Sequence, residues 1–124
     1  MAQTINQEEL KMNLEQFTGT EHYYEHQTIG RHNLLLTDGC QYLREKAKCY
    51  WLMDLICSWQ YKLHREPFQV WILKNIGIKG WDIVAEDGNK KQLAFQRISY
   101  SDFPIQEGVT LYLNDGVLMI PSEY

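Results

Sequence analysis

The sequence has no long apolar run, and that absence sets a first limit on its function. No stretch approaches the roughly 20 apolar residues that a helix needs to cross a bilayer. The opening residues, MAQTINQEELKMNLEQ, also lack the basic start and apolar core of a secretory signal. We therefore expect no membrane partner and a cytoplasmic location.

Cysteine is equally scarce. The chain has 3 cysteines, Cys40, Cys49 and Cys57, and two of them share one apolar segment. An odd number in such positions fits the reduced thiols of a core better than a disulfide framework.

Basic charge is in deficit. The chain has 12 lysines and arginines against 16 aspartates and glutamates, which gives a formal net charge of -4. A general nucleic-acid binder needs a basic surface to displace counterions from phosphates, so this composition disfavours that class.

Several enzyme signatures are missing as well. The sequence has no phosphate-cradling glycine loop, no dinucleotide fingerprint, no G-x-S-x-G elbow and no paired C-x-x-C. The glycine-rich stretch GIKGWDIVAEDGNK is typical of hairpin turns rather than of a strand-to-helix turn. We therefore predict no cofactor and lean away from an enzyme.

The residues that are present describe one small folded domain. With 124 residues, 44% of them hydrophobic and 23% charged, the chain can form its own core, and we predict a single domain spanning 1–124. Within residues 1–16, Leu10 and Leu14 lie four apart, which predicts a short N-terminal helix or arm. The run Leu34 to Leu36 predicts a buried strand.

The clearest predicted element is one long helix from residue 37 to residue 61. Thr37 or Asp38 can cap its first turn. Its first half is amphipathic, but from Cys49 to Trp59 apolar side chains cover almost every direction around the axis. A helix of that kind must be buried on most sides, by a sheet and by other chain or a partner.

The second half of the sequence predicts strands. Asp115-Gly116 supplies the positive φ of a two-residue hairpin turn between Leu111 and Ile120, and residues 87–89 indicate a second hairpin. The predicted fold class is α+β, with a mostly antiparallel sheet of about five strands packed on one long central helix.

The segment His22-Tyr-Tyr-Glu-His26 spells H-x-x-E-H, an inverted zinc-protease pattern. A zinc site would need both imidazoles on one stable helix and a third protein ligand. Glycines at 19 and 30 leave barely two turns, and no third ligand is identifiable. We therefore predict no metal site, keep His22 and His26 as the metal candidates, and expect Tyr23 and Tyr24 to dock this segment on the core.

Two further residues are catalytic candidates. Asp54 is the one charged residue between Cys49 and Trp59, and a buried carboxylate must find donors, reach water or bind a proton. It is either hydrogen-bonded for structural reasons or an acid lining a pocket. Cys40 falls in the predicted first helical turn, where the helix dipole favours a thiolate, although the neighbouring Asp38 opposes that effect.

Aromatic residues are abundant, with 4 tryptophans and 8 tyrosines. If Trp71 and Trp81 shared the outer face of the sheet, they would mark a protein interface or a ligand platform. Stacking of nucleic acid there would also need interleaved basic residues. Such residues occur in this region at Lys74, Lys79, Lys90, Lys91 and Arg97.

Taken together, the motifs resemble a family of small bacterial proteins of unknown function that is also found on mobile elements. The resemblance implies a stand-alone domain and a mobile-element context, without an activity. His26 belongs to the pattern and His22 does not. The pattern consists of TGTE with two tyrosines and a histidine (18–26), TDG with YL (37–43), YWL with an aspartate (50–54), FQVW (68–71), a Gly-Asn turn (88–89), YSDFP (100–104) and PSEY (121–124).

The leading functional prediction is a non-enzymatic binding module that docks a protein partner, associates with itself or sequesters a small ligand. Its candidate binding residues are Tyr23, Tyr24, His26, Trp71 and Trp81. The first alternative is a small enzyme with a helix–sheet cleft in which Asp54 meets His26, His64 or Glu25. The second is a nucleic-acid-binding regulator.

Overall fold

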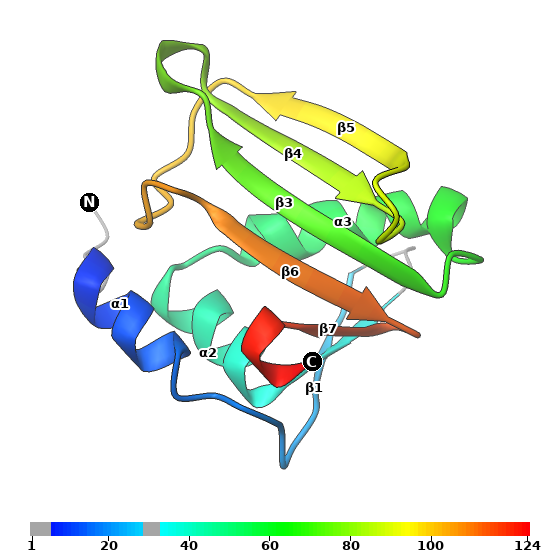
Figure 1. Cartoon of the computed structure of the whole chain (residues 1–124), viewed down its shortest axis with the longest axis horizontal. Helices are drawn as coiled ribbons and strands as arrows, with labels where there is room; N and C mark the ends of the chain where they lie inside the picture. Colours follow the sequence, from blue (N-terminus) through cyan, green and yellow to red (C-terminus); the bar gives the residue numbers. More distant parts are fainter. Residues whose placement is uncertain (1–5, 29–32) are drawn as a thin grey trace.

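The computed structural model describes residues 6–28 and 33–124 (Figure 1). In chain order the elements are α1 (Gln7–Leu14), β1 (Tyr24–His26), β2 (Leu34–Leu36), α2 (Asp38–Lys46), α3 (Tyr50–Leu63), β3 (Phe68–Asn75), η1 (Gly77–Lys79), β4 (Trp81–Glu86), β5 (Gln92–Ile98), β6 (Val109–Asn114), β7 (Val117–Met119) and η2 (Pro121–Glu123).

The strands of the described residues form one seven-stranded mixed sheet in the order β1-β2-β7-β6-β3-β4-β5. All neighbours are antiparallel except β2 and β7, which run parallel. The predicted five-stranded, mostly antiparallel sheet was therefore wrong. The prediction missed β1, a three-residue strand in a polar segment, which pairs with β2 so that Tyr24 lies opposite Leu36. It also missed the parallel pairing of β2 with β7, about 80 residues further along the chain.

The single long helix was also wrong, because the chain reverses direction in the middle of it. Ala47 caps the end of α2, Lys48 takes a positive φ of 55°, and α3 begins at Tyr50. The break lets two helices of different character bury separate faces, Cys40 and Leu43 on α2 and Leu52, Met53 and Ile56 on α3. No glycine or proline marks the break in the sequence.

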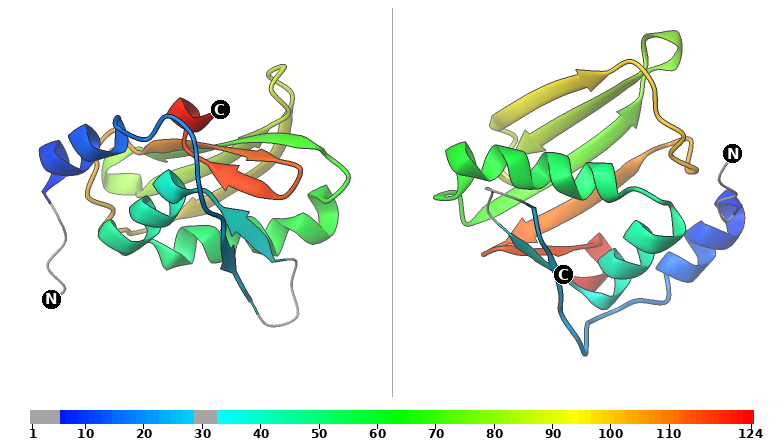
Figure 2. Two further views of the ribbon diagram at one scale, coloured as in Figure 1. Left: turned by 90° about the horizontal axis from the view of Figure 1, so that it is seen from below. Right: turned by 180° about the vertical axis from the view of Figure 1, so that it is seen from behind.

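Helix α3 is not enclosed on all sides, as the sequence suggested. Its exposed stripe includes Tyr50 and Tyr61, while Trp51, Leu55 and Trp59 are half-buried against the core. The helix lies across one face of the sheet, and the other face of β3, β4 and β5 carries no helix of the described chain (Figures 1 and 2). The molecule is therefore a two-layer structure with one open sheet surface.

Local signals that the sequence did show are confirmed. The predicted N-terminal helix forms as α1, and its Leu10 is buried. Its cap, Asn6, was not predicted; the Asn6 side chain accepts a hydrogen bond from the Glu9 backbone N–H. Asp115 and Gly116 have φ values of 49° and 84° and connect β6 to β7 as a two-residue turn. The loop after Glu86 joins β4 to β5 as the second predicted hairpin.

Within the described residues, no helix combines the length and the apolar character that crossing a membrane requires.

Candidate functional site

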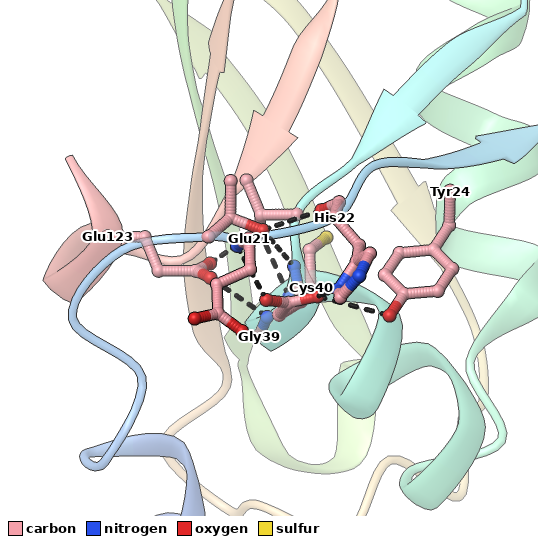
Figure 3. Close-up of polar contacts among 9 residues, drawn as sticks. Glu21, His22, Tyr24, Gly39, Cys40 and Glu123 are labelled. Carbon is pink, nitrogen blue, oxygen red and sulfur yellow. Dashed lines mark hydrogen bonds and ion pairs between the residues drawn. The ribbon is translucent and has the colours of Figure 1, made fainter.

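The first group of polar side chains surrounds the start of α2 and joins three distant parts of the chain (Figure 3). Thr37 caps the helix, since its hydroxyl oxygen accepts a hydrogen bond from the Cys40 N–H. The Glu123 carboxylate accepts hydrogen bonds from the Thr37 hydroxyl at 2.5 Å and from the Gly39 N–H at 2.9 Å. A carboxylate at a helix N-terminus also interacts favourably with the helix dipole.

Asp38 fastens the segment before β1 to the same helix end. Its carboxylate accepts hydrogen bonds from the Glu21 N–H at 2.9 Å and from the Tyr24 hydroxyl at 3.1 Å, and its own N–H donates to the Thr20 hydroxyl oxygen at 2.8 Å. The Glu21 N–H is the main reason that the pKa of Asp38 lies below its ordinary value. The hydrogen bond to Asp38 raises the pKa of Tyr24.

We call this group the α2 cap cluster. It unites residues of the TGTE, TDG and PSEY motifs, and each of them engages a backbone group or another member of the cluster. These motif residues therefore hold the fold together. The members of the cluster are Thr20, Glu21, Tyr24, Thr37, Asp38, Gly39 and Glu123.

The second group is a linear chain of three side chains from three elements, which we call the His26 relay. His26 of β1 lies with Nε2 2.7 Å from Asp54 Oδ1 on α3 and with Nδ1 2.8 Å from Arg44 Nη1 on α2. A guanidinium can only donate, so Nδ1 accepts and the proton of the neutral ring sits on Nε2, where it is donated to Asp54. The order of donation is therefore Arg44 to His26 to Asp54.

Exposure changes along the relay. His26 is 5% exposed, and the Arg44 side chain is mostly buried, whereas the Asp54 side chain is 55% exposed. The Arg44 guanidinium also lies over the Tyr50 ring, 5.1 Å from its centroid, and its Nη2 is 3.5 Å from the Glu45 carboxylate. A hydrogen bond with Glu45 raises the pKa of Tyr50.

The relay brings together the aspartate and one of the histidines that the enzyme alternative required. Of the proposed partners, His64 instead contacts the Gln60 carbonyl, and Glu25 accepts from Gln27 and Asn33. Both ring nitrogens of His26 are engaged, however, so the ring can act as a base or a metal ligand only if one of these bonds breaks. Its evident role is to hold the Asp54 carboxylate at the surface.

Sequence reasoning missed Arg44. It sits on the polar side of an amphipathic helix and reaches a histidine 18 residues earlier. No spacing rule connects a residue of one helix with a residue of a short edge strand, so no sequence signal marked this contact.

The geometry does not favour a reactive Cys40. The thiol is fully buried at the start of α2, and burial raises its pKa well above the ordinary value. Burial likewise raises the pKa of Cys49 to about 12. Both side chains are therefore neutral thiols at physiological pH, which are poor nucleophiles.

The H-x-x-E-H segment is not helical. Residues 24–26 form β1, so the two histidines diverge: His22 lies 3.9 Å from Asp38, and His26 belongs to the relay. Across residues 6–28 and 33–124, no three histidines, cysteines or carboxylates are grouped to hold a metal ion. Gly30, which bounded the predicted helix, lies outside the described residues.

Trp71 and Trp81 are buried on the helix side of the sheet, so they do not form the outer aromatic patch. Of the two tyrosines expected to dock on the core, Tyr24 is half-buried, whereas Tyr23 is mostly exposed. Helix α3 packs on the face of β3 that contains Gln69 and Trp71. The Gln69 amide accepts from the Trp71 indole N–H and donates to the Leu63 carbonyl, which makes its burial tolerable.

The outer surface carries a different set of apolar side chains, which we call the open face. They alternate with the buried residues along their strands and are half-buried or exposed. Tyr124 packs over them, with its ring centroid 5.4 Å from that of Phe68 and 5.3 Å from that of Tyr112. The members on the strands are Phe68, Val70, Ile72, Val84, Phe95 and Tyr112.

No curated protein and no solved structure matches this chain. The sequence model of one family, described as the family of unknown function DUF6876, matches residues 8–124. That span includes the α2 cap cluster, the His26 relay and the open face. The chain therefore belongs to this family of unknown function.

Proposed function

We propose that this protein is a non-enzymatic interaction module that pairs with a second copy of itself through the open face. The observation that supports the proposal is the one-sided covering of the sheet. Helix α3 covers the inner face of β3, β4 and β5 (Figure 2). Their outer face carries the apolar side chains of the open face, which are half-buried or, at Phe95, exposed. Contiguous exposed apolar surfaces of this kind mark sites of association.

Charge supports a second copy as the occupant. The open-face side of β3, β4 and β5 bears two basic and two acidic side chains, Lys74, Arg97, Asp82 and Glu86. Arg97 is paired with Asp82 at 2.6 Å. The surface is therefore balanced although the chain carries a net charge of -4, and two copies can approach through it without net repulsion.

Size is also adequate for a reversible dimer. At about 4.8 Å between strands and about 3.3 Å per residue, β6, β3, β4 and β5 cover a flat footprint of about 400 Å². Because side chains project from the strands, the solvent-accessible area of this footprint exceeds its flat area and approaches the roughly 800 Å² per partner of a standard interface. Two sheets packed face to face at about 10 Å would interdigitate Ile72, Val84 and Phe95 with their counterparts.

The relay gives no comparable support to an enzyme. Its imidazole is internally satisfied, Cys40 is a buried thiol, and the exposed Asp54 has no second carboxylate among its partners in the relay. Without an available base or nucleophile in this group, binding is the function that the geometry favours.

Sedimentation velocity on the purified protein tests the proposal. We expect the mass to rise from 14.7 kDa toward twice that value as the concentration increases from about 1 μM to about 1 mM, the range of weak self-association. Val84→Lys places a charge in the centre of the open face and should weaken the dimer by at least about tenfold. Ile78→Lys, at a residue 102% exposed in η1, should leave it unchanged.

A protein that keeps the mass of one chain at the highest concentration would overturn the proposal. So would a dimer that Val84→Lys does not weaken, because its interface would then lie elsewhere.

A further inference from the structure

The C-terminal end of α3, the start of β3 and the turn between β6 and β7 lie at the same end of the sheet (Figure 1). Residues of these segments line a cleft of about 370 Å³. Gln69 and Leu113, which line it, are buried on the helix side of their strands. The cleft is therefore a helix–sheet cleft, separate from the open face and from the His26 relay. Its volume falls in the range of small-molecule sites.

The floor of the cleft is a pair of buried carboxamides. Gln60 is 4% exposed and Gln69 is 1% exposed, and each donates its amide N–H to the other's carbonyl oxygen at 2.9 Å. Further bonds from Gln60 to the Ile56 carbonyl and from the Trp71 indole to Gln69 fix both amides in place. The floor is thus rigid and polar before any ligand arrives.

The carboxamide pair retains one acceptor position. Within residues 6–28 and 33–124, every amide N–H of the pair has a partner, whereas Gln60 Oε1 accepts a single hydrogen bond, from Gln69. A carbonyl oxygen can accept two. A ligand that reaches Gln60 must therefore offer a donor.

The walls favour a donor that carries positive charge. The acidic residues lining the cleft are Glu66 and Asp115, His64 lines it as well, and no lysine or arginine of the described residues does. Leu34, Pro67 and Leu113 supply apolar surface beside them. Charge-assisted hydrogen bonds to carboxylates are stronger than neutral ones.

We propose that this cleft binds a small organic cation, a protonated amine attached to an apolar body. The ammonium group sits between Glu66 and Asp115 within reach of Gln60 Oε1, and the apolar body packs on Leu34 and Leu113. This site is independent of self-association through the open face.

Two-dimensional NMR on the full chain tests the assignment with three probes of matched shape. 2-Phenylethylamine carries the ammonium, 2-phenylethanol is its neutral counterpart, and phenylacetate carries the opposite charge. The side-chain amides of Gln60 and Gln69 and the Trp71 indole N–H report directly on the floor. We expect 2-phenylethylamine to shift these signals saturably and to bind about tenfold more tightly than the alcohol, as a charge-assisted contact provides.

Conservative variants give the matched controls. Glu66→Gln keeps the shape of the side chain, and Asp115→Asn keeps a residue that tolerates the positive φ of the turn. Each should weaken binding of the amine several-fold and leave the alcohol unaffected, whereas Asp102→Asn, outside the cleft, should change neither.

Three results would overturn the proposal: no shift of the three reporters with any probe, tighter binding of phenylacetate than of the amine, or binding of the amine that neither Glu66→Gln nor Asp115→Asn weakens.

Discussion

The α2 cap cluster and the His26 relay both tie the segment around β1 to the helices, but they do so by different means. In the cap cluster, Asp38 and Glu123 accept hydrogen bonds from backbone N–H groups of Glu21 and Gly39. In the relay, every bond runs between side chains, and the last member is exposed to solvent. Backbone contacts fix the path of the chain, whereas a side-chain relay fixes the orientation of a surface group.

The difference separates residues that fix the path of the chain from Asp54, whose orientation at the surface a side-chain relay fixes. The Glu123 and Asp38 carboxylates accept hydrogen bonds from other members of the cap cluster. Asp54 does present an oriented carboxylate to solvent. Mutations that act on the two groups separately test this contrast.

The largest expected effect is at the centre of the relay. His26→Ala removes a buried ring and leaves the mostly buried Arg44 guanidinium without its acceptor, so we expect a loss of about 3 kcal/mol in the free energy of unfolding. His22→Ala is the matched control, because this exposed histidine of the same H-x-x-E-H segment should change stability by less than about 0.5 kcal/mol. Urea denaturation measures both.

The exposed end of the relay should behave differently. Asp54→Asn keeps an oxygen that accepts from His26 and removes a charge that solvent already screens, so the expected cost is less than about 0.5 kcal/mol. If Asp54→Asn costs as much as His26→Ala, the exposed carboxylate carries the stability of the relay, and the contrast with the cap cluster fails.

The next effect concerns close packing in the cap cluster. A Cβ added at Gly39 would lie 2.8 Å from Glu123 Oε1 and 2.8 Å from the Ile120 side chain. Gly39→Ala should therefore push Glu123 away from the helix end and cost about 2 kcal/mol, within the usual range for overpacking. Thermal unfolding followed by circular dichroism can measure the loss.

Gly19→Ala is the control for this substitution, because nothing lies within 4 Å of the added Cβ. It should be neutral or slightly stabilising, since alanine restricts the unfolded chain. Equal losses at the two glycines would show that Gly39 acts through backbone freedom rather than through contact with Glu123.

These two regions also show where sequence reasoning succeeds. The Asp115-Gly116 turn and the short N-terminal helix α1 depend on residues within a few positions of one another, and both were predicted. Thr37 was predicted as a possible cap for the same reason. The Glu123 carboxylate, which accepts hydrogen bonds from the Thr37 hydroxyl and the Gly39 N–H at the same helix end, comes from the other end of the chain. The family was recognised because its motifs are strings of adjacent residues.

The failures all involve choices that tertiary packing decides. The break at Lys48 exists because α2 and α3 must bury different faces, and no residue type announces it. The alternation of side chains along β3 was compatible with packing of either face against the helix. The structure buries the face of Trp71 and Gln69, because Gln60 and the Trp71 indole N–H satisfy the Gln69 carboxamide by hydrogen bonds. Arg44 and His26 meet only because β1 joins the sheet.

The smallest effect is a pH dependence that belongs to the cap cluster. The N–H of Glu21, followed by the hydroxyls of Tyr24 and Thr20, stabilises the ionised Asp38 and holds its pKa below the ordinary value of 3.8. A depressed pKa contributes stability that is present above the unfolded value and is lost as pH falls through the folded value. Asp38→Asn should therefore reduce the loss of stability below about pH 4, measured by urea unfolding at a series of pH values.

Tyr24→Phe removes one donor and leaves the Glu21 N–H. Its loss of stability at acid pH should therefore lie between those of the wild type and Asp38→Asn. If the free energy of unfolding of Tyr24→Phe follows the same pH dependence as that of Asp38→Asn, the Tyr24 hydroxyl alone stabilises the ionised Asp38. The backbone N–H of Glu21 would then contribute nothing, and the cap cluster, like the relay, would depend on hydrogen bonds between side chains.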